Sequence, residues 1–435
     1  MNRKTIYFVA GESSADNHGA ALMRALQNLD IDLNFIGRGG PHMRAIAGER
    51  FENWIDRSGV LGLWEVIRHY GYFRRQFRAT LRDIEDSRPD AIVLIDYPGF
   101  NLRLARALYR HRITCKLIYY ISPQVWAWNR SRIKKMARWL DLMLCIFPFE
   151  AELYNQSGLR AIFVGHPMIE TLRMRKSASR TDSFHGQIDG EIDIERDPNL
   201  IGLFPGSRSR EVRKIFPVLV QTARELRKEK PHLRFEIAAG SAELACEIRQ
   251  MTNATNPQLN PLPLIRAEAE MKQSQATSGA EPLLPSTTGK GRVKEGSQTE
   301  DREFLKISVG ETAAIMLRAF VGIVASGSAT LEAAYFRLPF VLVYKVSWMT
   351  YLVGRLVVRV RYLGMPNVLA NKEIVPEFIQ HHARPHKLSK SILGLLDNRA
   401  MREKMLSDFD TIIRSLGEGG ASDNAARAIL EELRG

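Results

Sequence analysis

The chain has 435 residues, which is long enough for two or three domains, and its 45% hydrophobic and 25% charged residues are ordinary for a globular protein. The formal net charge of +14 is not ordinary, and residues 1–175 carry 26 Lys and Arg against 17 Asp and Glu, a net of +9. A basic half indicates an anionic partner: nucleic acid, an acidic lipid surface or a phosphorylated substrate. The three cysteines have neither metal-site nor redox spacing, which favours a reducing cytoplasm and argues against a disulfide scaffold.

The chain opens with the pattern of a doubly wound α/β domain. Residues 5–10 read as a buried strand, followed by the polar turn GESSAD and an amphipathic helix to about Leu29. A second strand is predicted at 33–36. No stretch of the chain reaches the ~18 apolar residues that a membrane-spanning helix needs.

Residues 61–82 differ in composition, because aromatic side chains alternate with arginines. This pattern has three interpretations: a solvated basic face over core aromatics, a nucleic-acid surface, or an interfacial helix whose aromatics enter lipid while its arginines meet headgroups. Nucleic acid is the least favoured, because no nucleic-acid-binding motif accompanies the charge. The lipid interpretation selects six residues: Tyr72, Phe73, Arg74, Arg75, Phe77 and Arg78.

Residues 91–101, AIVLIDYPGFN, combine a strand buried on both faces with an abrupt turn. In an open α/β sheet, ligands lie at the carboxyl ends of the strands, where this sequence places Asp96. Asp96 could instead be a turn-forming residue that bonds its own backbone. We favour a functional carboxylate.

Further strands are predicted at 116–121, 142–146 and 161–164, which gives a first sheet of about seven strands. The polar residues 176–198 read as an interdomain linker. A second α/β series follows, with strands at 200–204, 235–238, 304–309, 321–325 and 340–344 and a last helix that starts at Ser422 as N-cap. Within it, residues 252–303 contain no aromatic residue and read as a disordered insertion.

Two loops of the second series have the form of phosphate sites. Each follows a strand, contains glycine and opens a helix, so that main-chain amides would face an anion. They could also be capped helix starts with incidental anion affinity, but two such loops in one domain favour function. The residues concerned are Gly206, Ser207 and Arg208 in the first loop, and Ser326, Gly327, Ser328, Ala329, Thr330 and Glu332 in the second.

Signatures of other chemistry are missing from the sequence. Neither loop is a GxxxxGK[ST] motif, no GxGxxG follows a strand, and no His, Asp and Glu cluster has metal-ligand spacing. We therefore expect chemistry without a metal or a cofactor.

The ordered motifs GESSAD, GGPHM, GLWEV, IDYPGFN, SPQVWAW, FPFE, GHP, LFPGSRSREV, ASGSATLE and MPNVLA cover nearly the whole chain. Through them the chain resembles the lipid A disaccharide synthase family, inverting glycosyltransferases that join two acylated glucosamines during lipid A assembly. The sequence departs from the family at Ala15, where glycine is usual, and at Gly99, where many relatives have a second acid.

The resemblance implies a GT-B fold, two Rossmann-like doubly wound domains that face each other across a cleft. Residues 1–175 would form the acceptor and membrane-facing domain and 199–420 the donor domain, with 176–198 as linker, 252–303 as insertion and 421–435 as a C-terminal helix. It implies that the donor UDP-2,3-diacylglucosamine meets Arg208 and the Ser326–Thr330 amides with its diphosphate and Glu332 with its ribose. Asn367 and Glu377 would contact the donor sugar or nucleotide.

The acceptor, 2,3-diacylglucosamine 1-phosphate, would give its 6-hydroxyl proton to Asp96, with Glu12, Ser13 and Asp16 as further acceptor-side candidates. The products would be a β-1,6-linked disaccharide and UDP. Because both sugars would carry acyl chains and the acceptor a phosphate, we expect peripheral binding to the cytoplasmic face of the inner membrane through residues 61–82, and no nucleic-acid partner. The alternatives are another GT-B transferase or UDP-sugar epimerase, or a non-catalytic nucleotide-sugar-binding protein.

Overall fold

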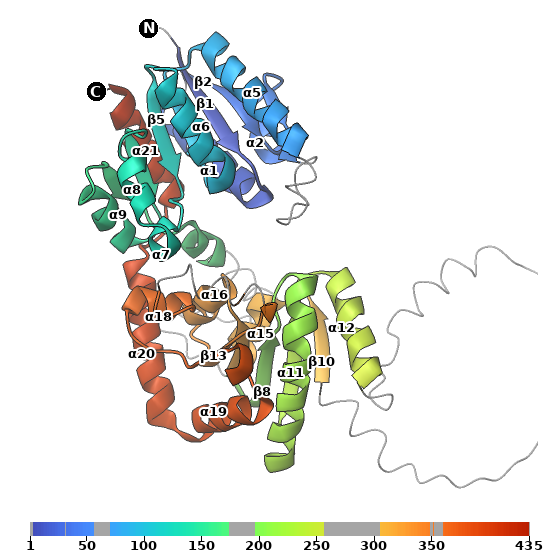
Figure 1. The fold of residues 1–435 in the computed structure, drawn as a ribbon. Coiled ribbons are helices and arrows are strands. Elements are labelled where there is room, and N and C mark those ends of the chain that lie inside the picture. The colour runs from blue at the N-terminus through green and yellow to red at the C-terminus, as the bar shows by residue number, and fades with distance from the viewer. Residues whose placement is uncertain are drawn as a thin grey trace, which may run out of the picture. The chain divides into compact units, whose positions relative to one another are not determined.

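The computed structural model describes residues 3–30, 32–55, 70–173, 196–255, 305–348, 351 and 360–434. The chain divides into two compact units, one around a seven-stranded sheet and one around a six-stranded sheet (Figure 1). Residues 61–69, most of the predicted linker and most of the predicted insertion lie outside the described residues. None of the described helices combines the length and apolarity that a membrane crossing requires.

The first sheet is parallel throughout and has the strand order β3-β2-β1-β4-β5-β6-β7. The strands are β1 (Lys4–Ala10), β2 (Leu33–Gly39), β3 (Phe51–Asn53), β4 (Ala91–Ile95), β5 (Lys116–Tyr120), β6 (Leu142–Cys145) and β7 (Ala161–Phe163). The sequence pattern located six of them. It missed β3, which has only three residues at the edge of the sheet, too few for a recognisable period.

Helices cover both faces of this sheet because alternate strand residues are buried on opposite sides. Ile6 and Phe8 of β1 face one apolar core, and Tyr7 and Val9 face the other. The first core is closed by α1 (Ser13–Leu29), α2 (Pro41–Ala47) and α21 (Ala421–Arg434). The second is closed by α5 (Tyr70–Ser87), α6 (Pro98–Arg110), α8 (Ser131–Met136) and α9 (Pro148–Asn155), with the short α7 (Val125–Trp128) between α6 and α8 in the chain.

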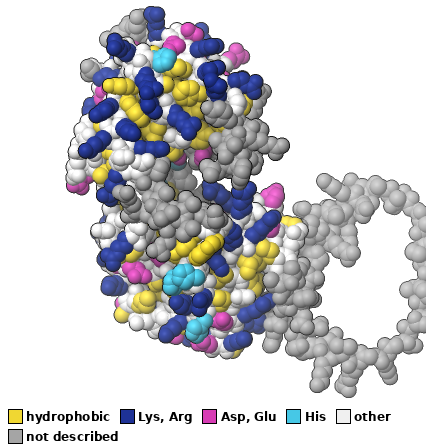
Figure 2. All heavy atoms as spheres, in the orientation of Figure 1, with side chains coloured by type: hydrophobic (Ala, Val, Ile, Leu, Met, Phe, Trp, Pro, Cys, Tyr) yellow, Lys and Arg dark blue, Asp and Glu magenta, His cyan; other side chains and the backbone are white. Residues whose placement is uncertain are grey.

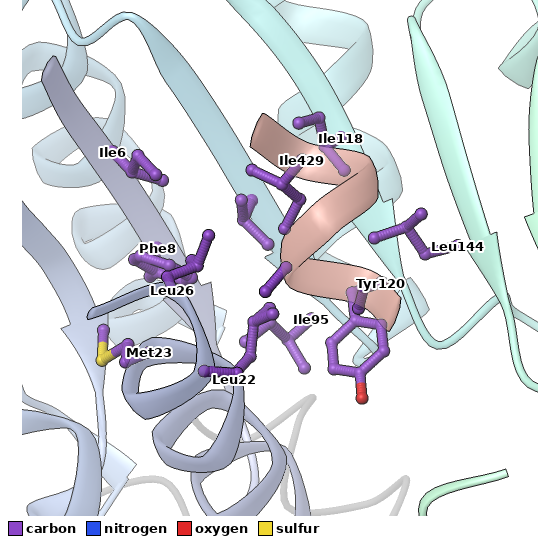
Figure 3. Close-up of a cluster of buried hydrophobic side chains, with 14 of the residues drawn as sticks. Ile6, Phe8, Leu22, Met23, Leu26, Ile95, Ile118, Tyr120, Leu144 and Ile429 are labelled. Carbon is purple, nitrogen blue, oxygen red and sulfur yellow. The ribbon is translucent and has the colours of Figure 1, made fainter. Parts of the chain in front are cut away.

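The last helix of the chain belongs to the first unit. Figure 3 shows Ile429 of α21 among side chains of β1, β4, β5 and α1. Glu432 of the same helix bridges Lys116 at 2.8 Å and Arg160 at 2.6 Å. The sequence predicted the helix, which begins at Ala421 rather than after Ser422, but did not indicate where it packs.

The second sheet is also parallel, with the order β10-β9-β8-β11-β12-β13. Its strands are β8 (Asp197–Phe204), β9 (Arg234–Ala239), β10 (Leu305–Val309), β11 (Ala319–Ala325), β12 (Phe340–Tyr344) and β13 (Glu377–Ile379). The accompanying helices are α11 (Ser209–Glu229), α12 (Ala242–Thr255), α15 (Thr312–Arg318), α16 (Ala329–Tyr335), α18 (Met365–Ala370), η1 (Gln380–His382), α19 (Pro385–Asp397) and α20 (Arg399–Ser415).

Two segments that were predicted to lack regular structure each overlap a strand or a helix by a few residues. Strand β8 begins at Asp197, inside the segment 176–198 that was expected to be a linker. Arg196 just before it donates to the main-chain oxygens of Met316, Ala319 and Phe336, which ties this start of the strand to the unit. Helix α12 continues to Thr255, inside the expected insertion 252–303.

Candidate active site

Both sheets have the strand order of a doubly wound fold, in which the connections run in opposite directions from one pair of neighbouring strands. Ligands bind at this switch point, outside the carboxyl ends of the two strands. In the first sheet the pair is β1 and β4, where Ala10 lies beside Ile95 in register. The next residues along each strand are Gly11 and Asp96, so the predicted catalytic carboxylate is located at the switch point.

The backbone of Asp96 is held in an unusual conformation. Asp96 has φ 44° and Tyr97 has φ 48°, both in the left-handed region that costs a non-glycine residue on the order of 1 kcal/mol or more. The main-chain oxygen of Asp96 accepts hydrogen bonds from the Asn101 amide at 2.8 Å and from the Tyr119 hydroxyl. Its N–H donates to the Tyr120 oxygen at 3.0 Å. These contacts fix the main chain from which the carboxylate projects.

The environment of Asp96 makes its carboxyl a stronger base than an ordinary aspartate. Burial, and next the negative charge of Glu12, raise its pKa to about 6, against the opposing hydrogen bond from the Tyr97 N–H. A carboxylate with this pKa is mostly ionised at neutral pH and is still basic enough to take a proton from a hydroxyl in a transition state.

The three acceptor-side candidates at the start of α1 have different surroundings. Glu12 and Ser13 are exposed, and Glu12 acts on Asp96 through its charge. Asp16 is buried, and its carboxylate accepts hydrogen bonds from the N–H groups of Gly40, His42 and Met43 at 2.9–3.0 Å. Asp16 therefore anchors the first turn of α2, and we retain Glu12 and Ser13 as the acceptor-side candidates.

The rings beside Asp96 are closely packed. Tyr97 lies against Gly11, where a Cβ would come within 2.2 Å of the ring. On its other side Tyr97 stacks on Phe100 at 6.2 Å, and Phe77 of α5 meets Phe100 edge-on at 5.6 Å. Phe77, which was expected to face lipid, is half-buried and packs against this aromatic cluster, so only part of its ring is open to a lipid.

The other membrane-facing candidates on α5 fall into two groups. Arg74, Arg75 and Arg78 are exposed. Tyr72 and Phe73 are half-buried and contact each other edge-on at 5.7 Å. The cationic part of the predicted surface is therefore on the outside of the helix.

Sequence reasoning missed Glu150, a fully buried acid beyond β6. Its carboxylate accepts hydrogen bonds from the hydroxyl of Ser122 and from the indole N–H of Trp126, the latter at 2.8 Å. Burial raises the pKa of Glu150 to about 7, although these hydrogen bonds oppose the shift. Ser122 and Trp126 lie in the motif SPQVWAW, and Glu150 lies in FPFE. Each motif follows a predicted strand, and this pattern could have indicated that the two motifs meet at the same edge of the sheet.

Two neutral histidines lie near this carboxyl edge of the sheet. Burial, and then the neighbouring His18, lower the pKa of His166 to about 4. The N–H of Met168 donates to Nδ1 of His166 at 3.2 Å, which places the ring proton on Nε2. Burial also lowers the pKa of His18, so both rings are suited to a structural role and not to carrying a proton at neutral pH.

In the second sheet the switch point lies between β8 and β11, where Phe204 is beside Val324. The two predicted phosphate loops leave these strands, so they lie side by side. Gly206 has φ 110°, and a Cβ there would come within 2.8 Å of a Glu211 carboxylate oxygen. The Arg208 side chain is 83% exposed and lies 3.9 Å from Glu211, which leaves its guanidinium available to a ligand.

Main-chain donors in these loops are open to a ligand. The N–H groups of Ser207, Gly327 and Ser328 have no acceptor in the described part of the chain. By contrast, Thr330 is buried and its N–H and hydroxyl both donate to the Gly327 oxygen, so its side chain shapes the loop. Glu332 follows in the first turn of α16. Unpaired amides around glycine form an anion-binding concavity.

Asn367 and Glu377 were expected to touch the donor, but most of their hydrogen-bonding groups are paired within the protein. Asn367 is fully buried, and its amide makes four hydrogen bonds, to the main chain of Ile374 and Val375 and to Glu377 at 2.9 Å. Glu377 also accepts from the N–H groups at the start of α18. Asn367 is therefore a positioning residue, and Glu377 remains the half-buried candidate of the pair.

The predicted site residues thus form two groups, one at each switch point. Asp96, Glu12 and Ser13 lie at the first, and Gly206–Arg208 and Ser326–Glu332 at the second. The first group offers a base, and the second offers donors for an anionic leaving group.

A family model and individual relatives with similar sequences name the same enzyme. The model of the family described as lipid-A-disaccharide synthetase matches residues 6–283 and 258–430. The chain is 35% identical to the lipid-A-disaccharide synthase of Geobacter sulfurreducens, over 98% of this chain and 97% of that protein. It is 32% identical to lipid-A-disaccharide synthase 1 of Legionella pneumophila strain Lens, over 99% and 98%.

Solved structures share the fold at low sequence identity. The UDP-GlcNAc 2-epimerase of Neisseria meningitidis aligns over 98% of this chain and 99% of its own, with a TM-score of 0.55 and 12% identity. A calicheamicin glycosyltransferase aligns over 100% and 99%, with a TM-score of 0.50 and 12% identity. These similarities establish the GT-B fold expected from the sequence.

Proposed function

The chain belongs to the lipid-A-disaccharide synthase family and is a glycosyltransferase, and from this premise we propose that Asp96 is its catalytic base. The reaction transfers 2,3-diacylglucosamine from its UDP derivative to the 6-hydroxyl of 2,3-diacylglucosamine 1-phosphate. The products are the β-1,6-linked disaccharide 1-phosphate and UDP. The observation that carries the proposal is a carboxylate with a pKa near 6 at the switch point of the first sheet.

In the proposed step, a carboxylate oxygen of Asp96 takes the proton of the acceptor 6-hydroxyl as that oxygen attacks the anomeric carbon. The bond from this carbon to the UDP oxygen breaks, UDP leaves with the electron pair, and the configuration inverts. Asn101 and Tyr119 hold the main chain of Asp96, so the backbone that carries the base stays in place during the step. A positioned base contributes on the order of 10²–10⁴-fold to the rate.

The leaving group would be stabilised at the second switch point. Charge that develops on the UDP diphosphate would be met by the Arg208 guanidinium and by the open amides of Ser207, Gly327 and Ser328. Glu332 would accept hydrogen bonds from the ribose. Glu377, oriented by Asn367, would contact the donor sugar or nucleotide.

We further propose that the protein works at the cytoplasmic face of the inner membrane as a peripheral protein. Both substrates carry acyl chains, so they partition into a bilayer. The exposed cations Arg74, Arg75 and Arg78 on α5 support attraction to an anionic surface.

The test is release of UDP from the acylated donor, with and without the acylated acceptor, for the native chain, Asp96→Asn and the control Asp86→Asn. Asp86 is an exposed acid near the end of α5, on a helix and not at the carboxyl end of a strand. We expect acceptor-dependent release from the native chain and the control, and a loss of at least 10²-fold for Asp96→Asn. Full activity of Asp96→Asn would overturn the role of Asp96, and epimerisation of UDP-N-acetylglucosamine without acceptor would favour the epimerase alternative.

A further inference from the structure

The segment that follows Asp96 has a one-sided charge that the proposed chemistry does not use. Residues 97–140 contain ten Lys and Arg and no Asp or Glu. On α6, Arg103, Arg106 and Arg110 recur at intervals of three and four, which places them on one face of the helix. All three are exposed, and none of them forms an ion pair with the described residues.

These cations line a groove of about 560 Å³ between α6 and α8. Six of its twelve lining residues are basic, and none of the twelve is acidic. The basic residues are Arg103, Arg106, Arg110, Arg132, Lys135 and Arg138. Figure 2 shows Lys and Arg side chains around a hydrophobic strip in the part of the molecule that holds α6 and α8.

The apolar lining of the groove comes from both helices and from the residues after them. Leu102 and Met136 are buried at its base. Tyr109 is 54% exposed, and Trp139 is half-buried. Aromatic side chains between an apolar base and cations are typical of surfaces that sit at the boundary between headgroups and acyl chains.

We propose that the α6–α8 groove docks the protein on a bilayer by binding the headgroups of anionic phospholipids. The guanidinium groups would bind lipid phosphates, and the first acyl carbons would lie on the apolar base. Like charges three and four residues apart on a helix repel each other, and an anionic surface removes this cost. This inference rests on the proposed function in one respect, since acylated substrates give a reason for docking.

One end of the groove lies close to Asp96 in the chain. Pro98 and Gly99, the first residues of α6, line one end of it. They follow Asp96 within three positions of the chain. A bilayer held at α6 and α8 would therefore present its lipids close to the proposed base.

The experiment measures binding of the full chain to vesicles of phosphatidylglycerol and phosphatidylethanolamine, with phosphatidylcholine vesicles as the neutral reference. The groove variant is Arg103→Glu/Arg106→Glu/Arg110→Glu. The matched control is Arg24→Glu/Arg44→Glu/Arg50→Glu, which makes the same charge change at exposed residues on α1 and α2 and in the turn after α2, on the other side of the sheet. A third variant, Arg74→Glu/Arg75→Glu/Arg78→Glu, tests α5.

We expect the groove variant to lose on the order of 100-fold in affinity for the anionic vesicles, and the control to lose far less. The α5 variant should fall between them. Equal losses in the groove variant and the control, or a loss confined to the α5 variant, would overturn the proposal. Binding to a DNA duplex with no binding to vesicles would identify a different partner and would also overturn it.

Quenching by phosphatidylglycerol with brominated acyl chains provides a second readout that does not depend on charge reversal. We expect these lipids to quench the fluorescence of Trp139, and Trp139→Phe to remove that part of the quenching. Quenching that is unchanged in Trp139→Phe would contradict an acyl chain at the base of the groove. If the native chain transfers no acylated sugar, the proposed function fails, while these binding results still decide the role of the groove.

Discussion

The side-chain amide of Asn101 lies 2.8 Å from the main-chain oxygen of Asp96 and 3.1 Å from that of Ile95. Asn101 is completely buried at the start of α6, so one side chain joins the end of β4 to the helix that follows the proposed base. Its contacts hold Asp96 and Tyr97 in their left-handed conformation.

Replacing Asn101 with Leu should lower both stability and turnover. The two carbonyl groups lose their donor, which we expect to cost about 1–3 kcal/mol in the free energy of unfolding. Loss of the orientation of Asp96 should also reduce kcat. The control is Asn155→Leu, because Asn155 similarly bonds both main-chain groups of Ala161 away from the switch point. Unfolding and steady-state assays should show a stability loss in both variants and a loss of kcat only at Asn101.

The activity should depend on pH through Asp96. The base must be deprotonated, so kcat/KM should fall as the pH drops below about 6, the pKa to which burial and Glu12 raise this carboxyl. Glu12→Gln removes a negative charge that raises this pKa, and the acidic limb should then move to lower pH. A pH–rate profile checks this, and a limb that stays in place would show that Glu12 does not act on the base.

Asp96→Asn should make the fold less sensitive to pH between about 4 and 6. The folded pKa of Asp96 is above its unfolded value of about 3.9. Its protonated form therefore stabilises the fold at low pH, and this contribution is lost as the pH rises through 6. We expect the variant to be more stable than the native chain at pH 8, with a smaller difference at pH 4. Equal denaturant midpoints of the two proteins at both pH values would contradict the shift.

Arg208→Ala should weaken UDP binding. Its exposed guanidinium has only a 3.9 Å contact with Glu211, and a charged hydrogen bond to a phosphate is worth about 1.5–3 kcal/mol, or roughly 10–100-fold in Kd. The matched control is Arg210→Ala, an exposed arginine in the first turn of α11. Calorimetric titration with UDP should separate the two, and equal affinities would remove Arg208 from the donor site.

Asp16→Ala should destabilise the protein, and Ser13→Ala should not. Asp16 accepts three main-chain hydrogen bonds at the start of α2, and their loss should cost about 2–3 kcal/mol in the free energy of unfolding. Ser13 is exposed, and we expect its replacement to affect only the KM of the acceptor. A stable Asp16→Ala variant with a raised acceptor KM would restore Asp16 to the acceptor site.

Much of this site could be predicted from local sequence. The strand before Asp96, its Pro-Gly turn and the glycine loops after β8 and β11 are short-range patterns, and the strand order then places them at the two switch points. Contacts between distant residues left no such pattern. The contact of Phe77 with Phe100 is an example, because an arginine-rich helix does not reveal which of its rings packs on a neighbouring helix.

The same reasoning explains the residues that were missed or given another role. Asn367 matched a family motif, and only the fold shows that its amide is used by Ile374, Val375 and Glu377. Glu150 depends on partners from the end of a neighbouring strand. The charge of residues 97–140 was readable in the sequence, but the groove requires the packing of α6 beside α8.

The packing of α21 on α1 and β5 has a consequence for synthesis of the chain. Five residues of α21, among them Ala425 and Ile429, complete a core whose other buried members lie between Ile6 and Val164. The ribosome releases the N-terminal part of this unit long before it synthesises the last helix. Part of one apolar face of the first sheet therefore stays exposed to solvent until translation ends. We expect nascent chains stalled before residue 421 to be bound by chaperones and cut by proteases within the N-terminal part, even after the second sheet has folded.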